Sequence, residues 1–385
     1  MLKIVKYIII TALVLIAVIG DIKTAIGQDN VQENKVKFAV ETNDVWTPTF
    51  QLCWNELINL IGTPKIQYVD KNPKLADELN KTPFNKEDLD DSDYYISVTK
   101  MTQKHKKEIE KAIWEKFQEK SDILDKFTFE NVSDNKTNKW FIYSILLKNF
   151  KFFTPYTVLD SDYFNNEQNE KYKYFGFTKK HKDNEAKEAL EQGYTDSLFY
   201  VNDDDFALKL TDKDKKEEMI LYVTSSDDSL ETIYNEVLNK SRYKNEYIKA
   251  RAKEASQKYG NYARIRFNNY YKIPFLHIDE VFNFDKELAD KDIKDKTYNA
   301  TGYTWRILKT LQTVKFDMNN EGAKLKSEAG IAIMKNTAFH EPETIIDIDN
   351  NYYFDRPFVI FLKETGKDKP YFAAKINNNK YLVQE

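Results

Sequence analysis

The stretch from Asn320 to Leu362 constrains the fold more than any other part of this 385-residue chain. It ends in an unbroken apolar run, Phe358-Val359-Ile360-Phe361-Leu362, which follows directly on a proline. Runs of β-branched and aromatic residues of this length are typical of strands that are buried on both faces. A chain with such a strand must pack a layer of structure against each side of it.

The segment before this run has the side-chain alternation of a strand, followed by a polar tail. Charged residues and a glycine alternate with small or apolar residues, which predicts one wet face and one buried face. The polar tail, from Lys335 to about Asn351, is long for a connection between two strands. The segment therefore has the composition of a loop that could become a strand. Its inward positions are Ala323, Leu325, Ser327, Ala329, Ile331 and Ile333.

Three motifs in this region resemble one known family. Asn320-Glu321-Gly322, followed by small residues, resembles the hinge of a serpin reactive-centre loop. Phe354-Asp355-Arg356-Pro357-Phe358 resembles the serpin signature beyond that loop, and residues 369–376 resemble the family's last strand. The resemblance implies an α+β, serpin-like single domain. Such a domain has a large central mixed sheet, additional smaller sheets, surrounding helices and an exposed reactive-centre loop near the C-terminus.

The rest of the chain reads as an alternation of helices and strands that agrees with this order. Helical periodicity predicts helices over about 50–61, over 102–120 and after a cap at Asp228. Period-two patterns and apolar runs predict strands over 94–98, 140–153, 198–201, 206–210, 219–224, 263–267 and 309–318. Thr47-Pro48-Thr49 is a poor match to the segment that opens a central buried helix in the family.

The N-terminus has the layout of an export signal. Lys3 and Lys6 precede an apolar run over residues 7–20, and Ala25-Ile26-Gly27 offers small residues for cleavage. We therefore expect a signal peptide over 1–27, with an uncleaved anchor as the alternative. Residues 28–385 contain no linker rich in Gly, Pro or Ser, so they are expected to form one domain. The predicted product is a secreted, extracellular monomer that does not contact a membrane after signal removal.

Composition argues against several other functions. The formal net charge of −4 gives no whole-chain reason to expect nucleic acid as a partner. Cys53 is the single cysteine, so neither a disulfide framework nor a thiolate metal site is possible, and its apolar neighbours predict a buried structural thiol. We find no phosphate-binding glycine loop and no catalytic motif, so the chain is not expected to be an enzyme or to need a cofactor.

Metal binding is not expected either. The four histidines show no metal-ligand spacing on a helix, and His105 lies among lysines, which predicts a surface position. Asp347-Ile348-Asp349-Asn350-Asn351 begins like a calcium loop, but Tyr352 stands where the loop needs glycine and Phe358 where it needs glutamate. The histidines are His105, His181, His277 and His340.

The resemblance implies a specific mechanism of protease inhibition. A serine protease, or as a second class a cysteine protease, would cleave the exposed loop and form an acyl-enzyme. The freed hinge would then insert into the main sheet as a new strand and trap the protease. The expected hinge residues are Glu321, Gly322, Ala323, Leu325, Ser327 and Ala329. The candidates for the scissile bond are Met334, Lys335, Asn336 and Thr337.

Three departures from the family pattern leave a second function open. Inhibitory members usually carry Thr or Ser where this chain has Ala323, and Leu325 is bulky for an inserting position. Gln312 stands where the resemblance predicts a histidine in a strand that helps to control opening of the sheet. The loop is also several residues longer than usual. The alternative is a non-inhibitory serpin-like binding or storage protein whose loop does not insert.

Overall fold

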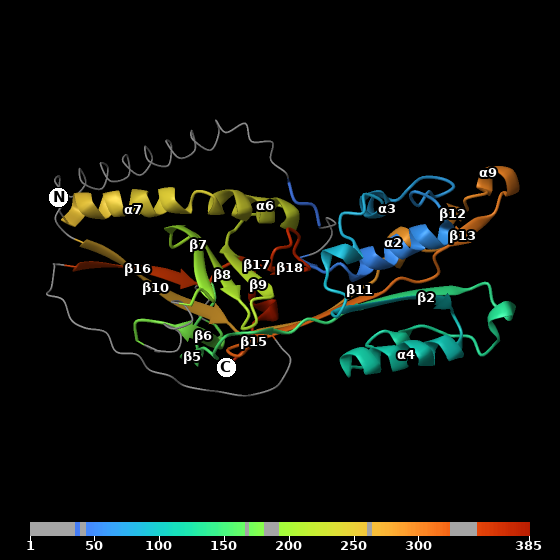
Figure 1. The fold of residues 1–385 in the computed structure, drawn as a ribbon, viewed down its shortest axis with the longest axis horizontal. Helices are drawn as coiled ribbons and strands as arrows, with labels where there is room; N and C mark the ends of the chain where they lie inside the picture. The colour runs from blue at the N-terminus through green and yellow to red at the C-terminus, as the bar shows by residue number, and fades with distance from the viewer. Residues whose placement is uncertain (1–34, 39–43, 166–168, 181–191, 260–263, 324–344) are drawn as a thin grey trace.

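The computed structural model describes residues 35–38, 44–165, 169–180, 192–259, 264–323 and 345–385 (Figure 1). The predicted signal peptide and most of the predicted hinge and scissile segment lie outside these residues. Among the residues described, there is no helix with the length and apolar character needed to span a bilayer.

The signature strand lies inside the largest sheet, as its apolar run predicts. β17 (Phe358–Glu364) pairs antiparallel with β9 (Glu217–Val223) on one side and β18 (Phe372–Ile376) on the other. Ile360 and Phe361 are fully buried although they point to opposite faces, which confirms a strand covered on both sides. The six strands run in the order β1 (Val45–Trp46), β18, β17, β9, β8 (Asp205–Thr211) and β7 (Thr195–Asn202).

A second sheet contains the parallel strand pair of the fold. β16 (Ile345–Tyr353) runs parallel to β10 (Arg264–Pro274), which pairs in turn with β6 (Tyr174–Phe177), and β6 pairs with β5 (Thr157–Val158). The prediction that the polar tail extends to about Asn351 is wrong, because β16 already begins at Ile345. Its acidic residues find partners across the sheet: Asp347 pairs with Arg266 at 2.7 Å. The segment that begins like a calcium loop is therefore extended strand.

The third sheet contains the first residues of the predicted hinge, and a separate two-stranded ribbon lies near it. The sheet has the order β11 (Leu276–Phe282), β14 (Gln312–Asn319), β15 (Gly322–Ala323) and β4 (Phe150–Lys151). The ribbon consists of β2 (Tyr94–Lys100) and β3 (Trp140–Leu146). The single long strand predicted over 140–153 is thus broken, because β3 ends at Leu146 and β4 begins only at Phe150. A further pair, β12 (Asp292–Lys294) and β13 (Thr304–Arg306), completes the sheets.

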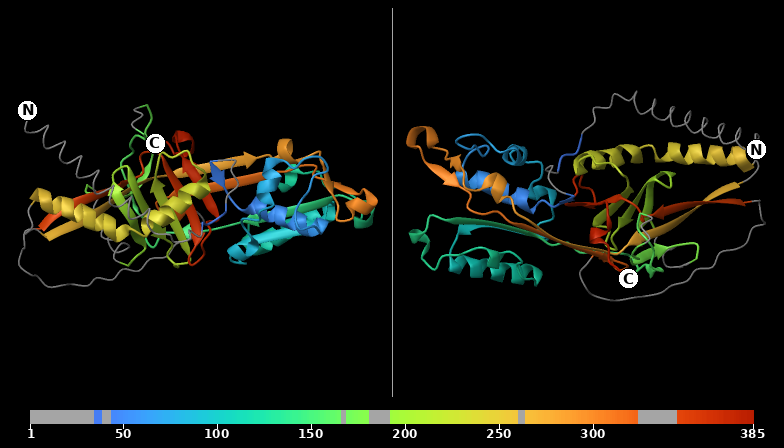
Figure 2. Two further views of the ribbon diagram at one scale, coloured as in Figure 1. Left: turned by 90° about the horizontal axis from the view of Figure 1, so that it is seen from above. Right: turned by 180° about the vertical axis from the view of Figure 1, so that it is seen from behind.

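Two helices flank the ribbon, one on each face. α2 (Thr49–Ile61) packs on one side, and α4 (Gln103–Phe117) covers the other side with Ile109 and Ile113 buried (Figure 1). α4 confirms the predicted amphipathic helix. The remaining helices are α3 (Lys74–Leu79), α6 (Leu230–Ser241), α7 (Lys244–Tyr259), α8 (Asp285–Leu288) and α9 (Tyr298–Thr301). Figure 2 shows from above that the molecule is elongated, with the ribbon and α2 at the end away from the six-stranded sheet.

Two local predictions need correction. The cap of α6 is Ser229, not Asp228, because the Ser229 hydroxyl accepts the amide of Thr232 at 3.2 Å while Asp228 accepts the Ser226 hydroxyl. His105 is not a free surface residue. Its ring nitrogens lie 2.7 Å from a Glu108 carboxylate oxygen and 3.0 Å from an Asp134 carboxylate oxygen, so the side chain ties α4 to the loop after it.

The predicted α+β class, with several sheets, surrounding helices and a large central sheet, is confirmed. β14 leads through Asn320 and Glu321 into the hinge, α4 lies across the ribbon, and the signature forms a central strand. The last strand, β18, pairs with that signature strand. These are the placements that the resemblance to serpins implies, and the fold is serpin-like.

The carboxylate of Asp295 gives a pH-dependent test of the turn before α9. It accepts the amide of Thr297 at 2.8 Å, the Thr297 hydroxyl at 2.6 Å and the indole N–H of Trp305 at 2.8 Å. These hydrogen bonds lower the pKa of Asp295 to about 2. Because the folded-state pKa is below the unfolded value, the stabilisation is present above about pH 4 and is lost as the pH falls toward about 2.

We therefore expect Asp295→Asn to be less stable than the wild type near neutral pH and to approach it as the pH falls from about 4 to about 2. Urea unfolding, followed by tryptophan fluorescence at each pH, measures this difference. The exposed Asp279→Asn on β11, which makes the same substitution outside this turn, serves as the control. A stability difference that stays constant across this pH range would contradict the role of Asp295.

Candidate functional site

A cavity of about 1090 Å³ lies between strands β3 and β14. On the ribbon side, β3 pairs with β2 along one edge only. On the other side, β14 pairs with β11 along its whole length but with β15 only at Met318 and Asn319. In the described part of the chain, the two edges that face the cavity therefore have no strand partner over most of their length. Backbone donors and acceptors in such a place favour a strand as the occupant.

The predicted hinge lies at one end of this cavity. Ala323 is opposite Met318 on one side and Phe150 on the other, so β15 is a two-residue strand between β14 and β4. The turn before it is fixed, because the amide of Tyr156 donates to the carbonyl of Asn320 at 2.8 Å and the amide of Phe152 to that of Glu321 at 3.1 Å. Glu321 is exposed, whereas Ala323 is 5% exposed and lines the cavity.

Gly322 is required by the close approach of β4. Its φ is +141°, and a Cβ at this position would lie 2.2 Å from the carbonyl oxygen of Phe150 and 2.9 Å from the Cα of Lys151. Only glycine avoids this overlap with backbone atoms. The hinge glycine therefore allows the first residues of the loop segment to lie between the two strands.

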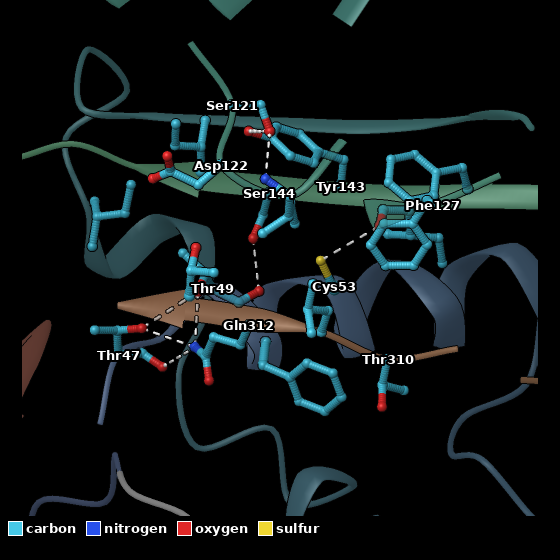
Figure 3. A pocket seen from close by; sticks show the side chains of 18 of the residues that line it. Thr47, Thr49, Cys53, Ser121, Asp122, Phe127, Tyr143, Ser144, Thr310 and Gln312 are labelled. Carbon is cyan, nitrogen blue, oxygen red and sulfur yellow. Dashed lines mark hydrogen bonds between the residues drawn. The ribbon is translucent and has the colours of Figure 1, made fainter. Parts of the chain in front are cut away.

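Both walls of the cavity are attached to the N-terminus of α2. The Gln312 side-chain nitrogen, on β14, donates to the hydroxyls of Thr47 and Thr49, each at 2.9 Å. The Ser144 hydroxyl, on β3, donates to the carbonyl of Thr49 at 2.7 Å. We call Thr47, Thr49, Ser144 and Gln312 the threonine anchor. Figure 3 shows the side chains of Ser144 and Gln312 reaching Thr47 and Thr49 at this helix end from opposite sides.

Sequence reasoning gave this anchor too little weight. The poor match of Thr47-Pro48-Thr49 to the family pattern hid its central position. A signal was present, since a proline just before an apolar helical pattern marks a helix start, and the threonines beside it leave hydroxyls at that end. Ser144 was also missed, although it is a small polar residue in a run of aromatic and aliphatic side chains. Gln312, predicted as a departure, is 8% exposed and acts as the amide donor of the anchor.

Cys53 lies in the cavity wall beside the anchor. Its sulfur is 3.9 Å from the carbonyl oxygen of Ile142, and burial raises the pKa of this thiol to about 11. The side chain is only half-buried by exposed area, because part of its surface faces the cavity. A thiol with this pKa is protonated at neutral pH, which favours the structural role predicted for it.

The opposite end of the cavity combines large apolar side chains with charged ones, such as Lys139, Asp292 and Lys309. Trp140, Trp305 and Leu308 line it, and Leu308 is 56% exposed. The cavity therefore runs from the hinge, past the polar threonine anchor, to an exposed aromatic and aliphatic end.

The structure describes only the first part of the predicted hinge. Of its described residues, Ala323 lines the cavity, Gly322 pairs beside it in β15, and Glu321 is exposed in the turn before them. The other predicted residues lie outside the described part of the chain, and their roles remain predictions. These residues are Leu325, Ser327, Ala329, Met334, Lys335, Asn336 and Thr337.

Comparison with known proteins finds similarity in structure only. No family model matches the chain, and no curated protein matches it. Among solved structures, the chain is similar to the native thermophilic serpin tengpin, with a TM-score of 0.44 and 10% identity over 89% of this chain and 90% of that one.

Two further solved structures are similar over most of their length. A serpin from the trematode Schistosoma haematobium has a TM-score of 0.40 and 9% identity, over 92% of this chain and 96% of that one. Thyroxine-binding globulin in complex with thyroxine has a TM-score of 0.40 and 10% identity, over 88% and 94%. These likenesses concern the fold and carry nothing about activity.

A double-mutant cycle tests whether the threonine anchor links the two cavity walls. Ser144→Ala and Gln312→Met each remove hydrogen bonds to a buried helix end, so each should lower the free energy of unfolding by about 1 kcal/mol. Because both side chains act on Thr49, their effects should not be additive. Urea unfolding of the wild type, the two single variants and the double variant measures the coupling. Additive effects, or an equal loss in the control Ser97→Ala on β2, would refute a shared anchor.

A pair of glycine variants tests the fit of the hinge. Gly322→Ala should lower stability by about 1–3 kcal/mol more than Gly366→Ala, because both positions have positive φ but only Gly322 meets neighbouring backbone. At Gly366, with φ +81°, an added Cβ meets nothing within 4 Å. Thermal unfolding of the two variants measures the difference. Equal losses would mean that β15 and β4 can separate at no cost.

Proposed function

We propose that this protein is a secreted protease inhibitor of the serpin type, in which a cleaved loop inserts as a strand between β3 and β14. One observation carries the proposal. Ala323 lies between β14 and β4 with a pairing partner on each side, at the end of a cavity bordered by two unpaired strand edges. The residues that follow it in the sequence have the small and apolar alternation that such a slot requires.

The register of β15 indicates where each inserted residue would lie. In an antiparallel pair, each step forward on one strand is a step back on the other. Because Ala323 is opposite Met318 and Phe150, continued pairing would place Ala329 opposite Gln312 on β14 and Ser144 on β3. The smallest inward side chain would thus arrive at the threonine anchor, where the two walls are held by the same helix end.

The same register explains why Leu325 matters. It would be opposite Phe316, which is 8% exposed, and beside Lys148, which also lines the cavity. Overpacking of this kind typically costs ~1–3 kcal/mol. Slower insertion gives the protease time to deacylate, and the inhibitor then behaves as a substrate.

The proposed partner is a serine protease, with a cysteine protease as the second class. Lys335 suits a trypsin-like pocket and Met334 a chymotrypsin- or subtilisin-like one, with Asn336 and Thr337 as the neighbouring candidates. In this mechanism the inhibitor supplies no catalytic group. Export through a signal peptide over 1–27 and a monomeric state belong to the same proposal.

Two variants with the same substitution at neighbouring positions test the insertion. Ser327→Arg places a cation on the inward face, opposite Val314, and should block insertion. Glu328→Arg places it on the outward face and should be tolerated. Each protein is mixed with trypsin, chymotrypsin, subtilisin and a papain-like protease, then denatured and examined on a gel for a covalent complex.

We expect a complex at the summed mass for the wild type and Glu328→Arg, and clean cleavage without a complex for Ser327→Arg. Cleavage of the wild type should also raise its thermal unfolding temperature, since the inserted strand satisfies the unpaired edges. Cleavage of the wild type with neither a complex nor a gain in stability would refute the inhibitor and leave the fold.

The end of the cavity away from the predicted hinge favours one second function, a non-inhibitory binding protein. Trp140 and Leu308 are exposed there beside the half-buried Trp305 and could contact an apolar ligand, and Leu325 would hinder insertion. In that case anilinonaphthalene sulfonate should bind the uncleaved protein and quench tryptophan fluorescence, and Leu308→Asp should weaken it. An inhibitor should lose this binding when its loop is cleaved, whereas a binding protein should keep it.

A further inference from the structure

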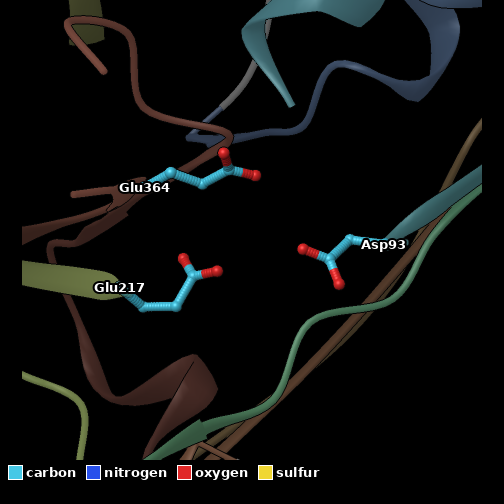
Figure 4. Close-up of side chains that lie close together, drawn as sticks. All are labelled: Asp93, Glu217 and Glu364. Carbon is cyan, nitrogen blue, oxygen red and sulfur yellow. The ribbon is translucent and has the colours of Figure 1, made fainter. Parts of the chain in front are cut away.

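Three carboxylates converge on one buried lysine at the hinge end of the cavity. The Lys148 ammonium lies 2.6 Å from an oxygen of Asp93, 2.8 Å from Glu217 and 2.6 Å from Glu364. Figure 4 shows the three carboxylates facing one another from separate segments of the chain. The Lys148 side chain is 9% exposed, and those of Glu217 and Glu364 are 10% and 11% exposed.

The cluster is held in a low-dielectric place and has an excess of negative charge. Its carboxylates lie within 4.8 Å of one another, and the ring of Tyr371 covers the ammonium with its centroid at 4.7 Å. One oxygen of Glu217 is buried without a hydrogen bond in the described structure. Since the ammonium already fills the space between the carboxylates, the cluster depends on Lys148 and not on an added cation.

The close packing of these charges favours the charged form of Lys148 and disfavours the charged form of Glu217. Burial disfavours the Lys148 ammonium, but the charge of Glu217 and the hydrogen bonds that the ammonium donates to all three carboxylates outweigh it and raise its pKa to about 12. Burial also raises the pKa of Glu217, and the neighbouring Glu364 charge adds to that rise. Lys148 is therefore charged at any physiological pH.

The four residues connect two separate parts of the fold. Lys148 follows β3, and Asp93 precedes β2, so both belong to the ribbon; their segments are joined by the Leu147 amide, which donates to the Asp93 carbonyl at 2.9 Å. Glu217 begins β9 and Glu364 ends β17, so both belong to the six-stranded sheet. The Glu364 carboxylate also accepts the amide of Asp90 at 2.7 Å.

The cluster lies where the ribbon meets the six-stranded sheet, and Lys148 lines the cavity between β3 and β14. β14 packs on the same sheet, because Phe316 stacks on Phe372 of β18 with ring centroids 4.5 Å apart. A shift of the ribbon relative to that sheet would therefore change the distance between β3 and β14. Such a shift would pull Lys148 from Glu217 and Glu364 and leave buried charges unpaired, which is far costlier than losing a surface ion pair.

We propose that Lys148 is a latch that fixes the β2–β3 ribbon against the six-stranded sheet and thereby sets the spacing between β3 and β14. It is a positioning residue, and its role concerns the uncleaved protein. The latch therefore stands whether or not the protein inhibits a protease.

Hydrogen exchange of the uncleaved full chain tests the latch. In Lys148→Met, amides of β2 and β3 should exchange at least about tenfold faster than in the wild type, while those of β8 should change little. The matched control is Lys272→Met. Lys272 is 11% exposed and pairs with Asp162 at 2.8 Å and Asp355 at 2.7 Å, but it lies on β10. This control should leave exchange in the ribbon unchanged.

Asp93→Asn keeps the protein testable if Lys148→Met does not fold. It removes one arm of the cluster and leaves Lys148 paired, so it should accelerate exchange in the ribbon by a smaller factor. Unchanged exchange in the ribbon of a folded variant, or equal acceleration in Lys272→Met, would overturn the latch. Neither readout involves a protease, so failure of inhibition leaves this test unaffected.

Discussion

In the part of the chain that the structure describes, β3 and β14 face each other across the cavity without pairing, and the rest of the structure depends on this separation. A buried edge leaves amides and carbonyls without partners, which is costly in a folded protein. Here β3 and β14 are kept apart by attachments on both sides. At mid-length the threonine anchor ties each strand to the same helix end. At the hinge end Lys148 ties the ribbon to the largest sheet.

These attachments have a common logic. Each attachment gives side-chain groups their hydrogen-bond partners at a place where direct pairing of β3 with β14 would have given partners to backbone amides and carbonyls. The separation therefore reflects a balance between two sets of hydrogen bonds, one present and one withheld. A strand that enters between the walls can add backbone pairing on both edges, and the buried face of β14 offers an apolar surface to its inward side chains. The proposed inhibition and the proposed latch both follow from this balance, although they can fail separately.

The sequence allowed the signature strand, the amphipathic helix α4 and the three strands β7 to β9 to be predicted, because their patterns are long and regular. It did not reveal β11, whose outward residues include His277 and Asp279 and give the segment the composition of a loop. The break between β3 and β4 was missed although Lys148 interrupts the apolar run. That lysine is compensated by carboxylates distant in sequence, and no local pattern shows such a partner.

The candidate site likewise has one part that local sequence indicates and one part that only the tertiary structure reveals. The turn at Asn320 and Glu321 and the tight fit of Gly322 follow from consecutive residues, so the sequence could indicate them, while the role of this segment as a hinge stays a prediction. The threonine anchor joins residues from α2, β3 and β14, which only the tertiary structure brings together. Its polar atoms look unremarkable one at a time, and their importance comes from the hydrogen bonds that join them.

The short strand β15 determines which step would limit the rate of insertion. Asn319 and Gly322 already pair across a two-residue turn, so the loop closure that normally limits hairpin formation is complete. The first pairing of the strand is therefore already formed, and insertion would proceed by extension of β15 from this nucleus. The rate of insertion would then depend on how readily β3 and β14 separate ahead of the growing strand, and not on how quickly the loop finds its first pairing position.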